Sequence, residues 1–393
     1  MSLSVSQRLQ RARPSPTMAT SALATELRSQ GRPIIDLSAG EPDFDTPAHV
    51  RAAAIEAIGS GLTRYTPVEG SAALKAAIIG KFRRENGLEF APEQVIASSG
   101  AKQSCFNLAM AVLNPGDEAI IPAPCWVSYP DMVRLADAEP VMVNASLADG
   151  FRITPRALQA AITERTRLLF LNSPGNPTGA AYSRAEWQAL GAVLEQHPNI
   201  VIGADDIYEH IYWGPEPFVS FAAACPSLAD RTVTINGVSK CYAMTGWRIG
   251  YAAGPRKLVA AMKKLQGQST SNPCSISQAA SIAALEGGQD CVREMTQAFR
   301  VRHDYIVAAL DAIPGLRCIP AAGAFYAFPD AGEAIRRLGL ADDVALCELL
   351  LREADVAVVP GSAFGAQGHF RLSYACGIDT LKEAIGRMRR VLA

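Results

Sequence analysis

Residues 234–250 read Thr-Ile-Asn-Gly-Val-Ser-Lys-Cys-Tyr-Ala-Met-Thr-Gly-Trp-Arg-Ile-Gly. The stretch opens as an apolar strand, passes through a turn of small residues and reaches Lys240. Arg248 follows eight residues later, in a segment typical of a second strand, Arg248–Ala252. A lysine is by default a solvated surface charge. An amine that can form a Schiff base, close to a fixed guanidinium, instead suits an aldehyde cofactor that carries a phosphate.

The sequence upstream of this stretch alternates short apolar runs with helical segments, from Pro92 to Gly254. Candidate helices include Gln103–Leu113 and Arg184–Gln196. Candidate strands are Val95–Ser98, Ala119–Pro122, Pro140–Val143, Leu168–Leu171, Ile200–Gly203 and Thr232–Ile235. Several of these strands are apolar on both faces, as strands between two helix layers are. The alternation predicts a three-layer α/β/α domain around a mainly parallel sheet.

The pattern changes after about residue 290. The expected elements there are a long helix at Val292–Leu310, strands near Leu316–Ile319 and Ala324–Phe328, a helix at Asp343–Ala354, strands at Val356–Val359 and Phe370–Tyr374, and a last helix at Thr380–Leu392. This order predicts a smaller α+β domain. We therefore expect an N-terminal arm over 1–45 packed on the small domain, a large cofactor-binding domain over 46–290 and the small domain over 291–393.

Composition excludes several classes of protein. Of the 393 residues 49% are hydrophobic and 19% charged, which is too apolar for a disordered chain. A net charge of -1 argues against nucleic-acid or anionic-membrane partners, and no apolar run reaches the roughly 20 residues of a membrane span. The nine cysteines form no CxxC pair and the five histidines no ligand pair. We expect reduced thiols, no metal and a cytoplasmic location.

The N-terminal arm leaves two interpretations open. It has no acidic residue before Glu26, but it has Arg8, Arg11, Arg13 and several serines. That composition overlaps with organellar transit peptides, although no apolar secretory core follows. We favour an ordered arm over a targeting segment.

Three segments carry chemistry at the ends of expected strands. In Ser98–Gln103, small residues between a strand and a helix suit an anion at the helix N-terminus, although a tight turn with a serine N-cap explains them equally well. Asp205 and Asp206 follow a strand, where ligands bind in open α/β sheets. One of them, pointing inward, would keep a pyridinium nitrogen protonated, whereas a solvent-facing helix cap is the alternative. The loop Asn172–Gly179, with two prolines and two glycines, can hold Asn176 as a donor.

Two further side chains fit the same chemistry. Arg371 lies in an expected strand and would clamp a substrate carboxylate with its planar guanidinium, although an arginine on a strand often only faces solvent. Trp126 is by default a core aromatic residue, and it is equally suited to stack on a flat cofactor ring.

Taken together, these blocks resemble the class I/II aminotransferases, fold-type I enzymes that depend on pyridoxal 5'-phosphate. The nearest subgroup is the bacterial aspartate aminotransferases, which include prephenate- and aromatic-accepting members. The resemblance runs nearly end to end through these blocks: Ser38–Phe44, Asn172–Gly179, Asp205–Tyr208, Ser239-Lys240, Met244–Arg248 and the strand of Arg371.

The resemblance implies a role for each cofactor-binding residue. Lys240 would bind the cofactor aldehyde and later move a proton at the substrate Cα, and Asp205 would pair with the ring nitrogen. Tyr208 and Asn176 would hydrogen-bond the phenolic oxygen, and Trp126 would stack on the ring. The phosphate would be held by Gly100, Ala101, Lys102 and Arg248. Gly237 replaces a serine that binds phosphate in many relatives, which leaves either fewer contacts or compensation by Ser239.

The resemblance also implies substrates and an assembly. Arg371 would hold the α-carboxylate of the substrate with help from Gly40, Asn176 and Trp126. Tyr65 would reach the phosphate of a neighbouring subunit, which implies a homodimer with shared active sites. We expect an amino-acid donor, with aspartate first, and a 2-oxo acid acceptor such as 2-oxoglutarate.

Several alternatives remain open. Aromatic amino acids or prephenate are the next substrates, a C–S lyase using the same cofactor is a further possibility, and a regulator without turnover is the last. The cation for a distal carboxylate is Lys102, Arg13 or a group of the partner chain. Ser15 and Thr17 belong to an arm segment that resembles one closing over the substrate in aspartate/prephenate enzymes.

Overall fold

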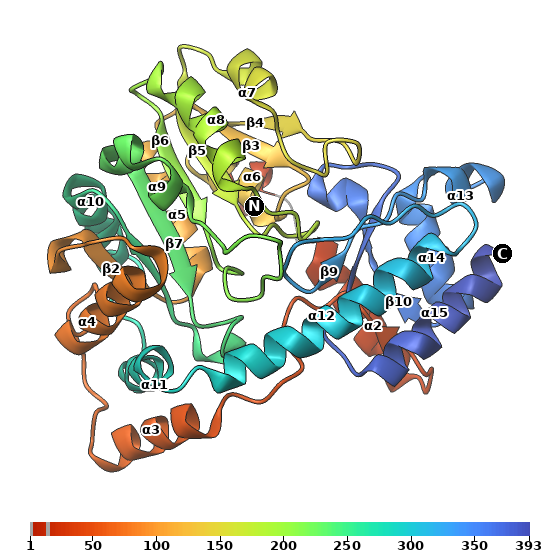
Figure 1. Cartoon of the computed structure of the whole chain (residues 1–393), viewed down its shortest axis with the longest axis horizontal. Helices are drawn as coiled ribbons and strands as arrows, with labels where there is room; N and C mark the ends of the chain where they lie inside the picture. Colours follow the sequence, from red (N-terminus) through yellow and green to blue (C-terminus); the bar gives the residue numbers. More distant parts are fainter. Residues whose placement is uncertain (1–2, 13–15) are drawn as a thin grey trace.

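A seven-stranded sheet forms the centre of the protein (Figure 1). The computed structural model describes residues 3–12 and 16–393. Across the sheet the strands lie in the order β2 (Val95–Ser98), β8 (Gly250–Ala253), β7 (Thr232–Gly237), β6 (Val201–Asp205), β5 (Thr166–Asn172), β3 (Glu118–Ala123) and β4 (Glu139–Asn144). Every neighbouring pair is parallel except those that β8 makes with β2 and β7. The predicted α/β fold with a mainly parallel sheet is therefore confirmed.

Both faces of the sheet are covered because its strands are apolar on both sides. In β5, Leu168 and Phe170 pack into one core, whereas Leu169 and Leu171 pack into another. The helices on the first face are α5 (Ala101–Val112), α6 (Ser128–Leu135) and α10 (Arg256–Gly267). Those on the second face are α4 (Ala72–Lys81), α7 (Pro155–Ala161), α8 (Arg184–Glu195), α9 (Phe221–Ala224) and α11 (Ser275–Glu286). Outside α11 lies α3 (Ala48–Gly59), at the edge of the molecule (Figure 1).

A smaller α+β unit follows the long helix α12 (Asp290–Asp311), as the sequence predicts. Its antiparallel sheet has the order β11 (Val359–Pro360), β12 (Phe370–Ser373) and β9 (Tyr326–Ala327). The helices of this unit are α13 (Gly332–Arg337), α14 (Asp343–Glu353) and α15 (Ile378–Leu392). The N-terminal segment contributes α1 (Gln7–Arg11), α2 (Pro16–Ser29) and β1 (Ile35–Asp36), and β1 pairs in parallel with β10 (Val356–Ala357).

Three expected strands differ in the structure. Residues 316–319 form no strand, and Arg317 makes only an isolated bridge to Asp330. The expected strand Val356–Val359 is divided, because its first half pairs with β1 and its second half with β12. The strand after the lysine starts at Gly250, because Arg248 has a left-handed backbone with φ 55° that ends a short helical turn.

The ends of the parallel strands place the chemistry. β5, β6 and β7 are adjacent and point the same way, so the segments that follow Asn172, Asp205 and Gly237 meet at one edge of the sheet. That edge is where open α/β sheets bind ligands. No helix in the described part of the chain is long and apolar enough to cross a membrane.

Candidate active site

A cavity of about 300 Å³ opens at this edge, between the large sheet and the small one. Of the predicted site residues these line it: Gly40, Ala101, Lys102, Trp126, Asn176, Asp205, Tyr208, Ser239, Lys240, Arg248 and Arg371. Gly100 directly precedes the lining residue Ala101 in the chain. Tyr65 lies outside the cavity with 92% of its surface exposed. Of the arm residues, Arg13 and Ser15 fall outside the described residues, as does the side chain of Thr17.

Lys240 directs its amine into the cavity from the turn after β7. Its Nζ donates a hydrogen bond to the carbonyl of Gly40 at 2.5 Å and lies 5.9 Å from the centre of the Phe325 ring. The pKa of Lys240 is lowered to about 8, chiefly by burial, with a smaller lowering by Arg371 and Arg248 that Glu41 opposes. The side chain is only partly shielded from water, so the amine is both reachable from the cavity and a usable base near neutral pH.

Asp205 ends β6 and faces the same cavity as a buried carboxyl group. Its Oδ2 accepts hydrogen bonds from the Tyr129 hydroxyl at 2.7 Å and from the Cys105 thiol at 3.7 Å, and its Oδ1 accepts one from the backbone N–H of Ile207 at 3.2 Å. Burial raises the pKa of Asp205 to about 6, against the lowering effect of these donors. Such a carboxyl group is suited to a cationic ring nitrogen, which would restore its usual ionisation.

Asp206 is buried too, but on the other side of the strand end. Successive side chains along an extended chain point in opposite directions, so only Asp205 of the pair faces the cavity, as predicted. The alternative that placed an acid in solvent is wrong, because both side chains are at most 4% exposed. Burial and the nearby Glu209 raise the pKa of Asp206 well above its usual value.

The N-terminus of α5 and Arg248 form a cationic end of the cavity. The N-cap is Gly100, with φ 91°, and no side chain caps the helix, so a serine cap is excluded. Arg248 donates to the carbonyls of Thr245 at 2.8 Å and Ser99 at 3.3 Å. A Cβ on Gly100 would come within 2.2 Å of the Arg248 guanidinium, so only glycine lets the two approach. Free amide groups and a guanidinium together suit a phosphate.

Arg371 is a buried cation that comes from β12. It is 2% exposed, and it donates to Asn176 Oδ1 at 2.9 Å and to the carbonyl of Ser38 at 2.6 Å. Its Nε has no hydrogen-bond partner among the described residues, and none of their carboxylates forms an ion pair with it. Burial lowers the pKa of Arg371. A buried guanidinium without a counter-charge is suited to bind a ligand carboxylate.

Trp126 and Lys102 also line the cavity. The Lys102 ammonium lies 4.9 Å from the centre of the Trp126 ring, and that ring packs edge-on against Tyr129. Burial lowers the pKa of Lys102, and so does the charge of Arg248. No carboxylate in the described ranges pairs with Lys102. This cation is therefore available to a ligand as well.

Four residues that hold the predicted site residues in place were not predicted individually: Tyr129, Cys105, Tyr326 and Asn172. Tyr129 lies one helical turn beyond Trp126, and Cys105 lies on the inner face of α5; these positions are the only signal in the sequence. Tyr326 lies under Arg371, with the guanidinium carbon 4.5 Å from its ring centre. Asn172 holds the loop that carries Asn176, because it accepts the Asn176 N–H at 2.9 Å and donates to the carbonyl of Asp205 at 2.8 Å.

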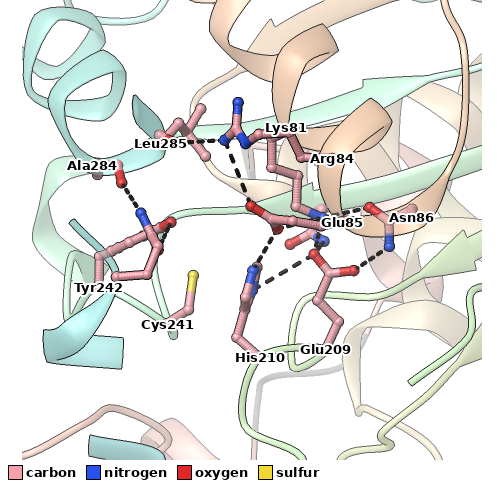
Figure 2. A network of polar contacts seen from close by, with 12 residues as sticks. Lys81, Arg84, Glu85, Asn86, Glu209, His210, Cys241, Tyr242, Ala284 and Leu285 are labelled. Carbon is pink, nitrogen blue, oxygen red and sulfur yellow. Dashed lines mark hydrogen bonds and ion pairs between the residues drawn. The ribbon is translucent and has the colours of Figure 1, made fainter. Parts of the chain in front are cut away.

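A network of polar contacts joins the segment after β6 to the end of α4 and the residues that follow it (Figure 2). The ammonium of Lys81 ion-pairs with Glu209 and donates to Asn86 at 2.8 Å. Asn236, four residues before Lys240, donates to Glu209 at 2.8 Å, and His210 contacts Glu85 at 2.8 Å. The network therefore fastens the segment after β6 and the end of β7 to the π-helix Phe82–Asn86. Glu85, Glu209 and His210 lie close enough to bind a metal ion, but the Lys81 ammonium already occupies the space between the two carboxylates.

Comparisons with known proteins agree with this geometry. Residues 32–388 match the model of the family "Aminotransferase class I and II". The chain is 52% identical to the aspartate/prephenate aminotransferase of Nitrosomonas europaea, over 100% of both chains. It superposes with a TM-score of 0.95 on the aspartate aminotransferase of Rhizobium meliloti, at 47% identity and over 100% and 99% of the two chains. For the Thermus thermophilus aspartate aminotransferase with maleate the TM-score is 0.93, at 43% identity and over 99% and 100%. The chain therefore belongs to the family of class I and II aminotransferases.

Proposed function

We propose that this aminotransferase moves an amino group between aspartate and a 2-oxo acid such as 2-oxoglutarate, with pyridoxal 5'-phosphate as its cofactor. The observation that carries the proposal is Arg371, a buried guanidinium whose Nε is unpaired in the described structure. The α-carboxylate of an amino acid would supply the missing charge and acceptor. Relatives at 50–52% identity are named for aspartate, or for aspartate and prephenate, which supports the choice of substrate.

The groups around the cavity fit this cofactor. Asp205 offers a buried carboxyl group to a ring nitrogen, and Tyr208 and Asn176 offer donors to a phenolic oxygen. The N-terminal amides of α5 and Arg248 fit the phosphate, with Lys102 and Ser239 beside them. Bound pyridoxal phosphate supplies an aldehyde that takes up the amino group and a ring that accepts the electrons of a broken Cα bond.

Lys240 is the catalytic base in this proposal. The pKa of its amine is lowered to about 8, chiefly by burial. The amine takes the proton from the substrate Cα and then gives it to the cofactor carbon that carries the aldehyde group. The carbonyl of Gly40, 2.5 Å away, fixes the direction of the amine before the substrate arrives. Since a free lysine has a pKa near 10.4, this shift increases the share of base at neutral pH by more than a hundredfold.

Arg371 and Asn176 orient the substrate. Their mutual hydrogen bond holds the guanidinium and the amide side by side, so both meet one carboxylate. A carboxylate fixed at that position determines which bond to Cα stands perpendicular to the cofactor ring. When the Cα–H bond stands there, proton transfer and hence transamination result, rather than loss of another group. Trp126, on the cavity wall, closes the site beside the ring.

Lys102 is the proposed partner of a distal carboxylate. Its ammonium lies against the Trp126 ring on the cavity wall and has no acidic partner in the described ranges. Binding of a dicarboxylate between Arg371 and Lys102 predicts a preference for aspartate and 2-oxoglutarate over monocarboxylates.

The proposed assembly is a homodimer. Tyr65 is 92% exposed, and Ile55, Ile58 and Leu62 beside it are 46–70% exposed on α3 and the loop that follows. Such an apolar surface is suited to a second copy of the chain, with Tyr65 reaching the phosphate of the partner. We further propose domain boundaries near residues 45 and 290, and a cytoplasmic location, which the nine free cysteines support.

Two experiments test the proposal. With purified protein, pyridoxal phosphate, aspartate and 2-oxoglutarate, oxaloacetate and glutamate should form in equal amounts. Arg371→Leu should lower kcat/KM for aspartate by about a thousandfold, because an unpaired carboxylate is then left in the site, and Arg371→Lys should recover part of the loss. The proposal is wrong if pyruvate and ammonia form from cysteine conjugates while aspartate does not react. Prephenate, named in several relatives, is the second acceptor to assay.

A further inference from the structure

Tyr326 joins the two halves of the site. It lies on β9 of the small sheet and is 1% exposed, yet its side chain lines the cavity. Its hydroxyl lies 2.9 Å from the hydroxyl of Tyr208, which follows β6 of the large sheet. The two rings meet edge to face, with their centres 5.8 Å apart. A buried hydroxyl pair thus bridges the two sheets at the floor of the site.

The face of the same ring supports the carboxylate-binding arginine. The guanidinium carbon of Arg371 lies 4.5 Å above the Tyr326 ring, within the range of a cation–π contact. The hydroxyl end of Tyr326 is close to Gly40, where an added Cβ would meet the hydroxyl at 2.9 Å. Tyr326 therefore touches the substrate-binding arginine with its ring and the cofactor-facing tyrosine with its hydroxyl.

We infer that Tyr326 is a positioning residue that links the charge at Arg371 to the donor strength of the Tyr208 hydroxyl. This inference rests on the proposed function, because it takes Tyr208 as the donor to the phenolic oxygen of the cofactor. A hydroxyl that accepts one hydrogen bond becomes a stronger donor in the next. When Tyr208 points its own proton toward the cofactor, its oxygen accepts a hydrogen bond from the Tyr326 hydroxyl, and the phenolic oxygen of the cofactor is stabilised as an anion.

The charge of Arg371 acts on this chain of hydroxyl groups. A guanidinium above the ring stabilises negative charge on the Tyr326 oxygen and makes its proton a better donor; it also lowers the pKa of Tyr326, against the larger raising effect of burial. A substrate carboxylate on Arg371 cancels that charge. Binding of the substrate then weakens the Tyr326 donor, and the cofactor oxygen holds its charge less well. The arrangement gives the cofactor a different proton affinity before and after carboxylate binding.

The test is a pH titration of the absorption band of the bound cofactor. The quantity measured is the midpoint, the pH at which half of the change in the band has occurred. Tyr326→Phe keeps the ring under Arg371 but removes the hydroxyl. We expect the midpoint to rise by about half to one pH unit, the effect of a single hydrogen bond, while the dissociation constant of a dicarboxylate such as maleate changes less than about threefold. Tyr326→Leu should shift the midpoint similarly and also weaken maleate binding about tenfold.

A double-mutant cycle shows whether Tyr326 acts on the cofactor through the Tyr208 hydroxyl or only through a general effect on the structure. In a Tyr208→Phe background, Tyr326→Phe should no longer move the midpoint, because Tyr208 is the group through which it acts. Tyr374→Phe is the matched control: it removes a buried hydroxyl that donates to the carbonyl of Ala324 in the same region but does not line the cavity. It should leave the midpoint unchanged.

Two results overturn the inference while the proposed function stands. One is an unchanged midpoint in Tyr326→Phe, and the other is an equal shift in the presence and absence of Tyr208. A different result would count against the proposed function itself: a wild-type protein that shows no cofactor absorption band after incubation with pyridoxal phosphate. The two failures are therefore distinguishable in one set of spectra.

Discussion

The hydroxyl of Tyr129 donates a hydrogen bond of 2.7 Å to Oδ2 of Asp205. It comes from α6, and the aspartate ends β6, so a helix on one face of the sheet fixes the acid at its edge. Tyr129 is held in turn by stacking on Phe170, with ring centres 5.0 Å apart at an angle of 14°. The acid is thus oriented by a tyrosine whose ring is fixed by Phe170, a residue outside the cavity.

Loss of this hydroxyl should impair catalysis. In Tyr129→Phe the pKa of Asp205, already raised to about 6 by burial, rises further, because a donor that lowers it is gone. The carboxylate then pairs less well with a ring nitrogen. We expect kcat to fall about tenfold or more, given roughly 1.5–3 kcal/mol for a hydrogen bond to a charged group. Steady-state kinetics between pH 6 and 9 measure this loss, which should be larger at the acid end.

The control for that variant is Tyr182→Phe. Tyr182 is another buried tyrosine that stacks on an aromatic ring, Trp187, and its hydroxyl accepts the N–H of Ile153. It lies outside the catalytic cavity, so kcat should stay within about twofold of wild type. Equal losses in both variants would mean that Tyr129 acts on stability alone.

Lys102→Ala should change substrate preference. The variant keeps the backbone amide at the α5 N-terminus but loses the ammonium beside Trp126. We expect kcat/KM for aspartate to fall about a hundredfold and that for alanine to change less than threefold, since only a dicarboxylate uses the second cation. Parallel assays of wild type and variant with aspartate and with alanine measure these two changes in kcat/KM. A loss of the same size for alanine would assign Lys102 to the cofactor instead.

Removal of one charged partner from the network in Figure 2 should destabilise the folded protein. Lys81→Met leaves the Glu209 carboxylate buried without its cation, and breaking a buried ion pair costs about 3–5 kcal/mol of unfolding free energy. The matched control is Lys263→Met, which removes a more exposed partner of Glu69 and should cost less than about 1 kcal/mol. Urea unfolding measures both. Similar midpoints for the two variants would contradict this role of the network.

The same network should make stability depend on pH. Burial alone would lower the pKa of His210, but Cys241, Glu209 and Glu85 raise it to about 10. The folded value lies above that of the unfolded chain, near 6.5, so the stabilisation is complete below pH 6.5 and is lost as the pH rises toward 10. Thermal unfolding across this range should show the decline in wild type, and Glu85→Gln should flatten it. An unchanged slope in Glu85→Gln would exclude the contact between His210 and Glu85 as its cause.

Much of the fold follows from local pattern. The runs at Val95–Ser98 and Leu168–Leu171 are apolar on both faces, and a strand between two helix layers is the structure that buries both. The site residues Asp205, Asn176 and Lys240 lie at the ends of such strands or a few residues beyond them, so their convergence at one edge follows from parallel pairing.

The rest depends on contacts between distant segments. Tyr129 and Asp205 are 76 positions apart, and Lys81 and Glu209 are 128 apart. Nothing local to Tyr326 indicates that its hydroxyl meets Tyr208, because that contact depends on how the small sheet is seated against the large one. The prediction of one strand at 356–359 was wrong for the same reason. Its first half pairs with β1 and its second half with β12, and both partners are distant in the sequence.

The most direct test of the account is the half-reaction of Lys240→Ala. Wild-type protein loaded with pyridoxal phosphate and mixed with aspartate alone should convert the cofactor absorbance to that of the pyridoxamine form and release oxaloacetate. Lys240→Ala should still bind the cofactor through Asp205, Arg248 and the α5 N-terminus, but convert it at least about ten-thousandfold more slowly, because it lacks the amine that moves the Cα proton. Conversion by the variant at a rate within tenfold of wild type would contradict the account.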